Sequence, residues 1–246
     1  MGVTLALLGC GAGTATAGGT YTVLQMNLCL SGLAGCYGKV DYPAGVEEAV
    51  SRIRDARPDA VTVNEACQAD VRRIARRTGY HARFTRVLYR GRRLACVSPG
   101  GRGLFGHAVL TKSAITRTDS RDFSSQQGIE RRRWLCVSTR GGVDVCTAHL
   151  NTRARRERAG NDAQCAELAA LLKRRAVIFG GDVNRRTPCA PRGHSVRTDS
   201  DAGQAPGLQH VYAGRAFGSP TARVVPAEHT DHDFLIVQFA RPLLGG

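Results

Sequence analysis

Polar side chains that could take part in chemistry border several strand-like runs of this sequence. The run "IFGGDVN" ends in Asp182 and Asn184, and "AVTVNEAC" carries Asn64 and Glu65 at its end. Carboxylate and carboxamide oxygens are hard ligands that suit Mg²⁺, Mn²⁺ or Ca²⁺. Three further runs are bordered in the same way, by Asn27 in "VLQMN", by His149 and Asn151 in "CTAHLN", and by His229, Asp231, His232 and Asp233 in "EHTDHDFLIV".

These residue types together suit the hydrolysis of a phosphate ester. Two histidines flanked by carboxylates favour proton transfer and the stabilisation of developing negative charge, and a hard metal ion adds to that stabilisation. The sequence shows no Ser or Cys nucleophile in an elbow and no P-loop. A polar residue at one strand end is more often a turn-former or a cap than a catalyst. Five such ends, however, predict one shared site.

The elements that would position these residues can be predicted from apolar periodicity. Runs rich in β-branched or aromatic residues and bounded by Gly or Pro predict strands, at 22–26, 60–64, 105–110, 134–138, 143–148, 176–179 and 234–239. Apolar residues at helical spacing predict helices within 42–59, 67–79 and 156–175. This mixture favours an α/β or α+β fold with a mixed sheet. Because no linker or repeat divides the chain beyond about residue 20, we expect residues 20–246 to form a single catalytic domain.

The motifs "QMN", "NE", "FGHAVLTK", "AHLNT", "GGDVN" and "TDH", in this order, resemble those of the endonuclease/exonuclease/phosphatase superfamily. That group includes pancreatic-type deoxyribonucleases, abasic-site endonucleases, inositol-polyphosphate phosphatases and neutral sphingomyelinases. The resemblance covers roughly residues 21–240. It implies a four-layer α/β sandwich, in which helices flank two mixed sheets. It also implies hydrolysis of phosphodiester bonds with a divalent metal ion, Mg²⁺ or else Mn²⁺ or Ca²⁺.

The resemblance assigns a role to each matched residue. The metal ligands would be Asn27, Glu65 and Asp231, and the catalytic residues would be His149, Asp182 and His232. Asp182 would orient or deprotonate the attacking water. His149 would act as a general acid or electrophile near the scissile group. His232 would contact the phosphate or act in acid–base catalysis.

Other residues near the same motifs are expected to contact the substrate. The resemblance places Asn184 against the phosphate, and Asn151 belongs to the same group of substrate-binding residues. Arg153 and Arg185 directly follow the catalytic strands, so we expect them to approach the substrate phosphate. Gly181 is expected to let backbone and phosphate approach closely.

One family feature has no direct counterpart in this sequence. Many members carry an Arg-Ile-Asp-Tyr-like strand upstream of the Asp-His pair, and its Asp holds the catalytic histidine. The stretch "SPTARVVPAEHTDH" has no such Asp, and the possible substitutes are Glu228, Asp199 and Asp201. In the alternative alignment "HDFLIV" is that strand, Asp233 is the orienting residue, and the terminal Asp-His pair is missing. We favour the first alignment, because a Thr-Asp-His followed by a final strand fits the end of the chain.

The formal net charge of +15 indicates an anionic partner. All but three of the 35 basic residues are arginine, a bias that a GC-rich genome also produces, so charge alone favours nucleic acid only modestly. We expect a monomeric nuclease, with a phospholipid or sphingomyelin phosphodiesterase or a phosphomonoesterase as the alternative. A lipid hydrolase should expose an aromatic or aliphatic loop, and the sequence shows no convincing one. A catalytically inactive basic binding domain is a remoter alternative.

The nine cysteines indicate disulfides and not a structural zinc site, because no Cys-x-x-Cys pair is present. Cys10 stands apart, and the other eight form an even set, as a disulfide framework requires. Cys29 and Cys36 could close a short loop. Cys136 and Cys146 could face each other across a hairpin. The pairing of the remaining four stays open.

Residues 1–19 are typical of an export leader, a short apolar run followed by small residues. The stretch 15–17 fits a signal-peptidase site, and 7–10 resembles a lipobox in which Cys10 is the lipidated residue. The usual basic n-region is absent, so a truncated start or a disordered tail is the alternative. No later run of apolar residues is long enough to span a membrane. We therefore expect a secreted protein, or one anchored to the cell surface through Cys10.

Overall fold

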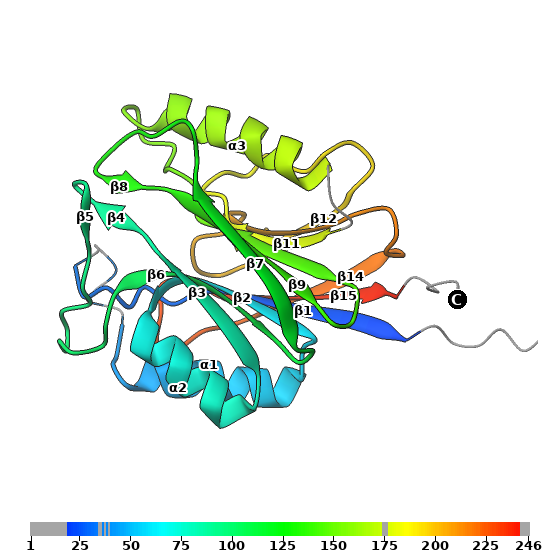
Figure 1. Cartoon of the computed structure of the whole chain (residues 1–246), viewed down its shortest axis with the longest axis horizontal. Helices are drawn as coiled ribbons and strands as arrows, with labels where there is room; N and C mark the ends of the chain where they lie inside the picture. The colour runs from blue at the N-terminus through cyan, green and yellow to red at the C-terminus, as the bar shows by residue number, and fades with distance from the viewer. Residues whose placement is uncertain (1–18, 34–35, 37, 39, 174–176, 242–246) are drawn as a thin grey trace, which may run out of the picture.

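Two β-sheets pack face to face and helices cover their outer faces (Figure 1). The computed structural model describes residues 19–241 except 34–35, 37, 39 and 174–176. Helices α1 (Ala44–Ala56) and α2 (Gln68–Thr78) lie outside one sheet, and α3 (Arg158–Lys173) lies outside the other. This arrangement is the predicted four-layer α/β sandwich.

The first sheet has the strand order β14-β15-β1-β2-β6-β3. Its strands are β1 (Thr20–Asn27), β2 (Ala60–Cys67), β3 (His81–Arg86), β6 (Phe105–Thr111), β14 (Pro220–Val225) and β15 (Phe234–Ala240). Strands β1 and β2 are parallel, and every other neighbouring pair is antiparallel. A parallel pair needs a crossover connection, and α1 provides it.

The second sheet has the order β12-β13-β11-β10-β9-β7 and repeats this arrangement. Its strands are β7 (Ile115–Asp122), β9 (Arg133–Thr139), β10 (Asp144–Ala148), β11 (Val177–Asp182), β12 (Ser195–Thr198) and β13 (Gln209–Ala213). Strands β10 and β11 form its parallel pair, and α3 is their crossover. A small third sheet contains β4 (Leu88–Tyr89), β5 (Arg92–Arg93) and β8 (Glu130–Arg131), in the order β5-β4-β8.

Three apolar layers hold these elements together. One layer lies between the first sheet and helices α1 and α2, one lies between the two sheets, and one lies under α3. Strand β1 contributes to two of them, because successive side chains of a strand point to opposite faces. Leu24 and Met26 enter the helix-side layer, whereas Tyr21 and Val23 enter the layer between the sheets.

Four disulfides join the cysteines that the structure describes. The expected pairs Cys29–Cys36 and Cys136–Cys146 are confirmed, and Cys136 lies directly opposite Cys146 in the β9–β10 ladder. The pairs that the sequence left open are Cys67–Cys96 and Cys165–Cys189. Cys10 and the predicted leader lie outside the described residues.

Four disulfides are typical of an extracellular protein, because reducing compartments keep thiols free. None of the helices in the described ranges has the length and apolar character that a bilayer crossing requires.

The longer disulfide loops are expected to contribute most to stability. Cys67–Cys96 spans 29 residues, and replacing both cysteines with Ser should lower the free energy of unfolding by roughly 3–4 kcal/mol. Cys29–Cys36 spans only 7 residues, and the matched double Ser variant should lose roughly 2 kcal/mol. Guanidinium unfolding of both variants checks this order. A larger loss from the short loop would contradict the chain-entropy argument.

Candidate active site

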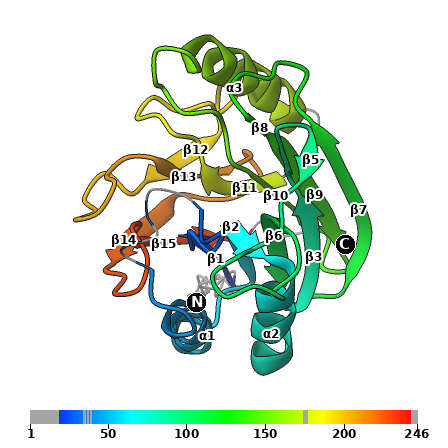
Figure 2. The ribbon, with the colours of Figure 1, turned by 90° about the vertical axis from the view of Figure 1, so that its left-hand side faces the viewer.

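The two parallel strand pairs bring four predicted site residues to one edge of the sandwich, the edge that faces the viewer in Figure 2. Asn27 ends β1, Glu65 lies near the end of β2, Asp182 ends β11, and His149 directly follows β10. His149 and Asp182 are paired in an extension of the β10–β11 ladder. Asn27 Nδ2 donates a hydrogen bond to Asp182 Oδ2 at 3.0 Å, so the two sheets meet here.

A β-bulge in β2 directs Glu65 into this site. Val63 lies opposite Ala108 and Ala66 lies opposite Gly106, so two residues of β2 face a single residue of β6. Such a bulge re-aims a side chain, and Glu65 has the positive φ of 55° that accompanies it. As a result, Glu65 Oε1 accepts a hydrogen bond from Asn27 Nδ2 at 3.0 Å.

The other bulge residue, Asn64, connects the two sheets. Its Oδ1 accepts a hydrogen bond from the Asp182 backbone N–H at 2.8 Å, and its Nδ2 donates to the Ala148 carbonyl at 3.2 Å. Gln25 Nε2 also donates to Asn64 Oδ1, at 2.9 Å. The fully buried Asn64 side chain therefore fixes the position of Asp182 in the second sheet relative to Glu65 in the first.

The Asp182 carboxylate lies at the centre of the cluster. Its Oδ2 is 3.6 Å from His232 Nε2 and 3.7 Å from His149 Nε2, in addition to its bond from Asn27. Its Oδ1 accepts the backbone N–H of Asn184 at 2.9 Å. A buried carboxylate between two imidazoles is an arrangement suited to proton transfer.

Asn184 fixes the tautomer of His149. Asn184 has φ 52°, and its Nδ2 donates to the Leu150 carbonyl at 2.9 Å and lies 2.9 Å from His149 Nε2. Because the same amide group donates to both, Nε2 is the acceptor and the proton of His149 is on Nδ1. That nitrogen is 3.7 Å from Glu65 Oε1. Burial above all lowers the pKa of His149 well below its usual value, and the nearby Arg132, together with His107 and His232, lowers it further, so the ring is neutral.

Two residues of the site, His107 and Arg132, were not selected as site residues from the sequence. The His107 ring is fully buried, 5.8 Å from the His149 ring, and burial lowers its pKa to about 3. Arg132 is also buried, and its Nη1 donates to Glu130 Oε1 at 2.9 Å. Arg132 stands second among three consecutive arginines, so nothing in the sequence separates it from its exposed neighbour Arg131.

The carboxylates of the site fit a divalent cation. Burial raises the pKa of Glu65 to about 7, with Glu130 and Asp182 adding to the effect. Asp231 Oδ1 is buried and accepts no hydrogen bond from the described part of the chain. A hard cation is the kind of partner that would satisfy either group. The Cys29 and Cys36 sulfurs also lie within 4.8 Å of Glu65, but they are joined in a disulfide and do not supply thiolate ligands.

The third predicted ligand, Asn27, donates from its NH₂ group to the carboxylates of Glu65 and Asp182. Its Oδ1 accepts the Cys29 N–H at 3.2 Å. Rotation of this amide would turn its oxygen toward a cation. The segment that carries Asp231 and His232 is held against the end of β1, because Thr230 Oγ1 donates to the Asn27 carbonyl at 3.0 Å.

The structure distinguishes the four acidic residues considered for holding His232. Asp233 accepts the backbone N–H groups of Gly203 at 2.7 Å and Ala227 at 3.1 Å, so its carboxylate holds the loops at 203 and 227 in place. The Glu228 side chain is 76% exposed, and Asp201 is also exposed. Asp199 is fully buried, and its carboxylate accepts two bonds from Gln209. His232 Nδ1 has no hydrogen-bond partner in the described part of the chain, so none of these four residues holds it directly. His232 Nε2 lies 3.6 Å from Asp182 Oδ2 and 4.0 Å from Asp231 Oδ1.

Arg153 and Arg185 lie side by side at the start of α3. Their Nη1 atoms contact Asp162 Oδ1 at 2.6 and 2.9 Å, and both also contact Asn161 Oδ1. Asp162 is largely exposed, so an incoming phosphate can compete with it for the guanidinium groups.

Asn151 is placed differently from its predicted substrate-binding role. Its Nδ2 donates to the Gln127 carbonyl at 2.7 Å, and its Oδ1 accepts Gln164 Nε2 at 2.6 Å. The side chain is buried, with both ends of the amide engaged. This geometry favours a positioning role, in which Asn151 holds the loop after β10.

The expectation for Gly181 is wrong. A Cβ atom at this position would meet the Ala148 carbonyl oxygen and the Phe179 ring, not an open site. At Gly180 a Cβ would meet the Thr62 hydroxyl of the facing sheet. The two glycines are therefore needed for the close approach of strands and sheets, and a substrate phosphate is not the cause.

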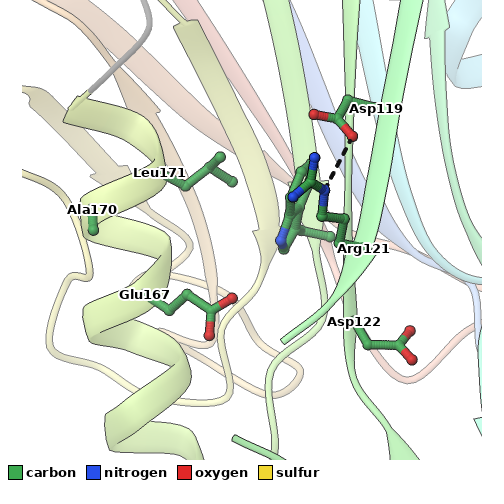
Figure 3. A pocket seen from close by; sticks show the side chains of 7 residues that line it. Asp119, Arg121, Asp122, Glu167, Ala170 and Leu171 are labelled. Atoms are coloured by element: carbon green, nitrogen blue, oxygen red, sulfur yellow. Dashed lines mark ion pairs between the residues drawn. The ribbon is translucent and has the colours of Figure 1, made fainter. Parts of the chain in front are cut away.

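A cavity of about 340 Å³ lies away from the cluster, between strand β7 and helix α3 (Figure 3). Glu167 and Leu171 of α3 face Asp119 and Arg121 of β7 across it, and these last two form an ion pair at 3.7 Å. No member of the cluster lines this cavity, so it does not belong to the candidate active site.

Hard-cation ligands next to two imidazoles, at one edge of such a sandwich, define a class of phosphoesterases that work with a divalent metal ion. The model of the endonuclease/exonuclease/phosphatase family matches residues 35–232. The chain belongs to that family, whose members are generally metal-dependent phosphoester hydrolases. No match was found among curated protein sequences.

Solved structures share the fold at low sequence identity. An endonuclease/exonuclease/phosphatase protein from Beutenbergia cavernae has a TM-score of 0.68 and 17% identity, over 90% of this chain and 72% of that chain. TDP2 from D. rerio, complexed with a single-strand DNA product, has a TM-score of 0.59 and 14% identity, over 89% and 98%. Sphingomyelinase C from Streptomyces griseocarneus has a TM-score of 0.53 and 17% identity, over 89% and 99%.

Proposed function

We propose that this protein is a metal-dependent nuclease that hydrolyses phosphodiester bonds in nucleic acid. The observation that carries the proposal is the position of Asp182 between His149 and His232, with Glu65 on the far side of Asn27. Residues 20–246 act as one catalytic domain, since both sheets contribute to this one cluster.

Asp182 takes the role of the base. It orients the attacking water and accepts its proton, while the Asn184 N–H holds its other oxygen in place. Neutral His149 donates from a ring N–H and stabilises charge on the phosphoryl group. His232 acts as the acid–base residue or contacts the phosphate. Arg153 and Arg185 contact the substrate phosphate on the side of α3.

Asn27, Glu65 and Asp231 would hold the divalent ion, with Mg²⁺ as the first choice for oxygen ligands. Bound there, the ion supplies a positive charge that stabilises the negative charge of the phosphate during its displacement. The orphaned Asp231 oxygen and the buried Glu65 carboxyl support this assignment.

Nucleic acid is the favoured substrate because of the net charge of +15 and the exposed arginines. TDP2, a structural relative, has been solved with a DNA product. The second candidate, hydrolysis of a phospholipid or sphingomyelin, is favoured by a different observation. Leu33 and Val97 are exposed apolar side chains on neighbouring loops near the disulfide beside Glu65, which the sequence had not indicated.

The test is EDTA-sensitive release of product from plasmid DNA, sphingomyelin and bis-p-nitrophenyl phosphate. We expect hydrolysis of DNA and of the small diester, restored by Mg²⁺ after EDTA. Release from sphingomyelin alone would select the second candidate. No hydrolysis of any substrate with Mg²⁺, Mn²⁺ or Ca²⁺ would leave a binding domain as the remaining function.

A further inference from the structure

Exposed arginines gather on the small third sheet. Arg90, Arg92, Arg93 and Arg131 all lie on β4, β5, β8 or the turn between β4 and β5, and we call these four the arginine platform. Within the described chain none of the four forms an ion pair. Guanidinium groups without carboxylate partners remain available to an anionic ligand.

The platform adjoins the catalytic cluster. Tyr89 of β4 is paired with Arg92 of β5 on one side and with Glu130 of β8 on the other, and directly paired residues share a face of a sheet. Glu130 also holds the buried Arg132, and the charges of Glu130 and Arg132 both act on the Glu65 carboxyl. The face that carries Arg92 is therefore the face turned toward Glu65. Arg93 and Arg131 are both paired with Leu88, so they lie on the opposite face of the small sheet.

A second group of exposed arginines continues the platform around the site. The Arg90 N–H donates to the Ile129 carbonyl at 2.6 Å, and Asn151 Nδ2 donates to the Gln127 carbonyl at 2.7 Å. The segment 127–131 thus joins the platform to the loop after β10, which carries the exposed Arg155 and Arg156. Figure 2 shows β5, β8 and β10 close together at this edge. The exposed arginines of the platform and of this loop therefore lie on connected segments at this edge of the sandwich.

We propose that the arginine platform binds the sugar–phosphate backbone of a nucleic-acid strand beside the bond that is cleaved. This inference rests on the proposed nuclease function and adds where the polymer lies. Several unpaired positive charges on a small sheet that adjoins the cluster suit a chain with a phosphate at every nucleotide. A lipid headgroup or a small diester presents a single phosphate, which Arg153 and Arg185 already serve.

A membrane surface fits the platform less well. Stable interfacial binding needs a contiguous apolar face in addition to basic residues. Ile129 is the one exposed large hydrophobic residue next to the platform among the described residues, whereas Leu33 and Val97 lie on other loops. A single apolar side chain among arginines is compatible with contact to a nucleotide base.

The test replaces Arg90, Arg92, Arg93 and Arg131 with Gln in one variant. Binding of a labelled oligonucleotide is measured in EDTA, where no cleavage occurs, over a range of salt concentrations. We expect at least about tenfold weaker binding at low salt, and a log–log salt slope that is less steep by about 1 for each phosphate contact that is lost. Turnover of bis-p-nitrophenyl phosphate with Mg²⁺ should stay within about twofold of wild type, since the small diester does not reach the platform.

A matched variant removes the same charge elsewhere: Arg76→Gln, Arg117→Gln, Arg140→Gln and Arg223→Gln are all exposed and lie away from this edge. This control should bind the oligonucleotide like wild type. Equal affinities for the platform variant and wild type would overturn the proposal. A loss of small-diester turnover by the platform variant as large as its loss of oligonucleotide binding would also overturn it. So would a platform variant that no longer binds phosphatidylcholine–phosphatidylglycerol vesicles but binds the oligonucleotide like wild type. If wild type binds the oligonucleotide through the platform but cleaves no diester, the proposed nuclease function is wrong, whereas the proposed binding of nucleic acid by the platform is supported.

Discussion

Replacing Asp182 with Asn is expected to lower phosphodiester turnover by about 10²–10⁴-fold, the range for loss of a general base. The substitution keeps the size of the side chain and an oxygen that can accept the Asn184 N–H, but it removes the charge between His149 and His232. Steady-state kinetics with bis-p-nitrophenyl phosphate and saturating Mg²⁺ measure the effect. The loss should fall on kcat, because the water is activated only in the transition state.

The matched control for this prediction is Asp55→Asn, which removes a carboxylate from the exposed side of α1. It should retain wild-type turnover. Circular dichroism and thermal unfolding must show that the Asp182→Asn variant is folded. Wild-type kcat in a folded Asp182→Asn variant would remove Asp182 from the mechanism and with it the proposed site.

Glu65→Gln is expected to change how stability depends on pH in the metal-free protein. The pKa of Glu65 is raised from 4.5 to about 7 in the folded protein, so the folded state binds this proton more tightly than the unfolded chain. The protonated Glu65 therefore stabilises the folded state below about pH 4.5, and this stabilisation is lost as the pH rises through about 7. Gln does not titrate, so the free energy of unfolding of the variant, measured relative to that of wild type, should rise by about 3 kcal/mol from pH 4.5 to above pH 7.

Urea unfolding in EDTA at several pH values measures this difference. Adding Mg²⁺ above pH 7 should reverse it. A hundredfold excess of ion over its dissociation constant stabilises wild type by about 2.7 kcal/mol, whereas the variant, which lacks a charged ligand, should respond far less. A stability difference that is independent of pH, together with an equal response of both proteins to Mg²⁺, would exclude Glu65 as a metal ligand.

The fold and the convergence of the site could be predicted because the strongest signals are those of the central strands. Strands β1, β2, β10 and β11 are buried along nearly their whole length, and their apolar runs end in the polar residues that meet. In the two large sheets, strands β3, β7, β12, β13 and β14 were missed. All but β13 are edge strands, and β3 ("HARFTR") and β7 ("ITRTDSRD") have mostly exposed side chains and lack an apolar pattern. β13 ("QHVYA") is buried but short, and its polar Gln209 and His210 interrupt the apolar run.

Side-chain partners were harder to predict than strand ends. The prediction for Asn151 used only its position after a strand, and its buried bonds to Gln127 and Gln164 depend on tertiary contacts. The role of Asn64 depends on the packing of one sheet against the other. Asp199 could be proposed only as one of several acidic residues, because its burial beside Gln209 distinguishes it from Asp201 and Glu228.

The matching strand orders of the two sheets divide the proposed site between them. The first sheet contributes Asn27 and Glu65, and the second contributes His149 and Asp182 from the equivalent strand ends. The chain up to β6 thus carries the proposed cation ligands Asn27 and Glu65, and the chain after it carries the proposed base Asp182. A polypeptide cut between β6 and β7 would therefore regain function only when the two fragments reassociate, and activity would report directly on their docking.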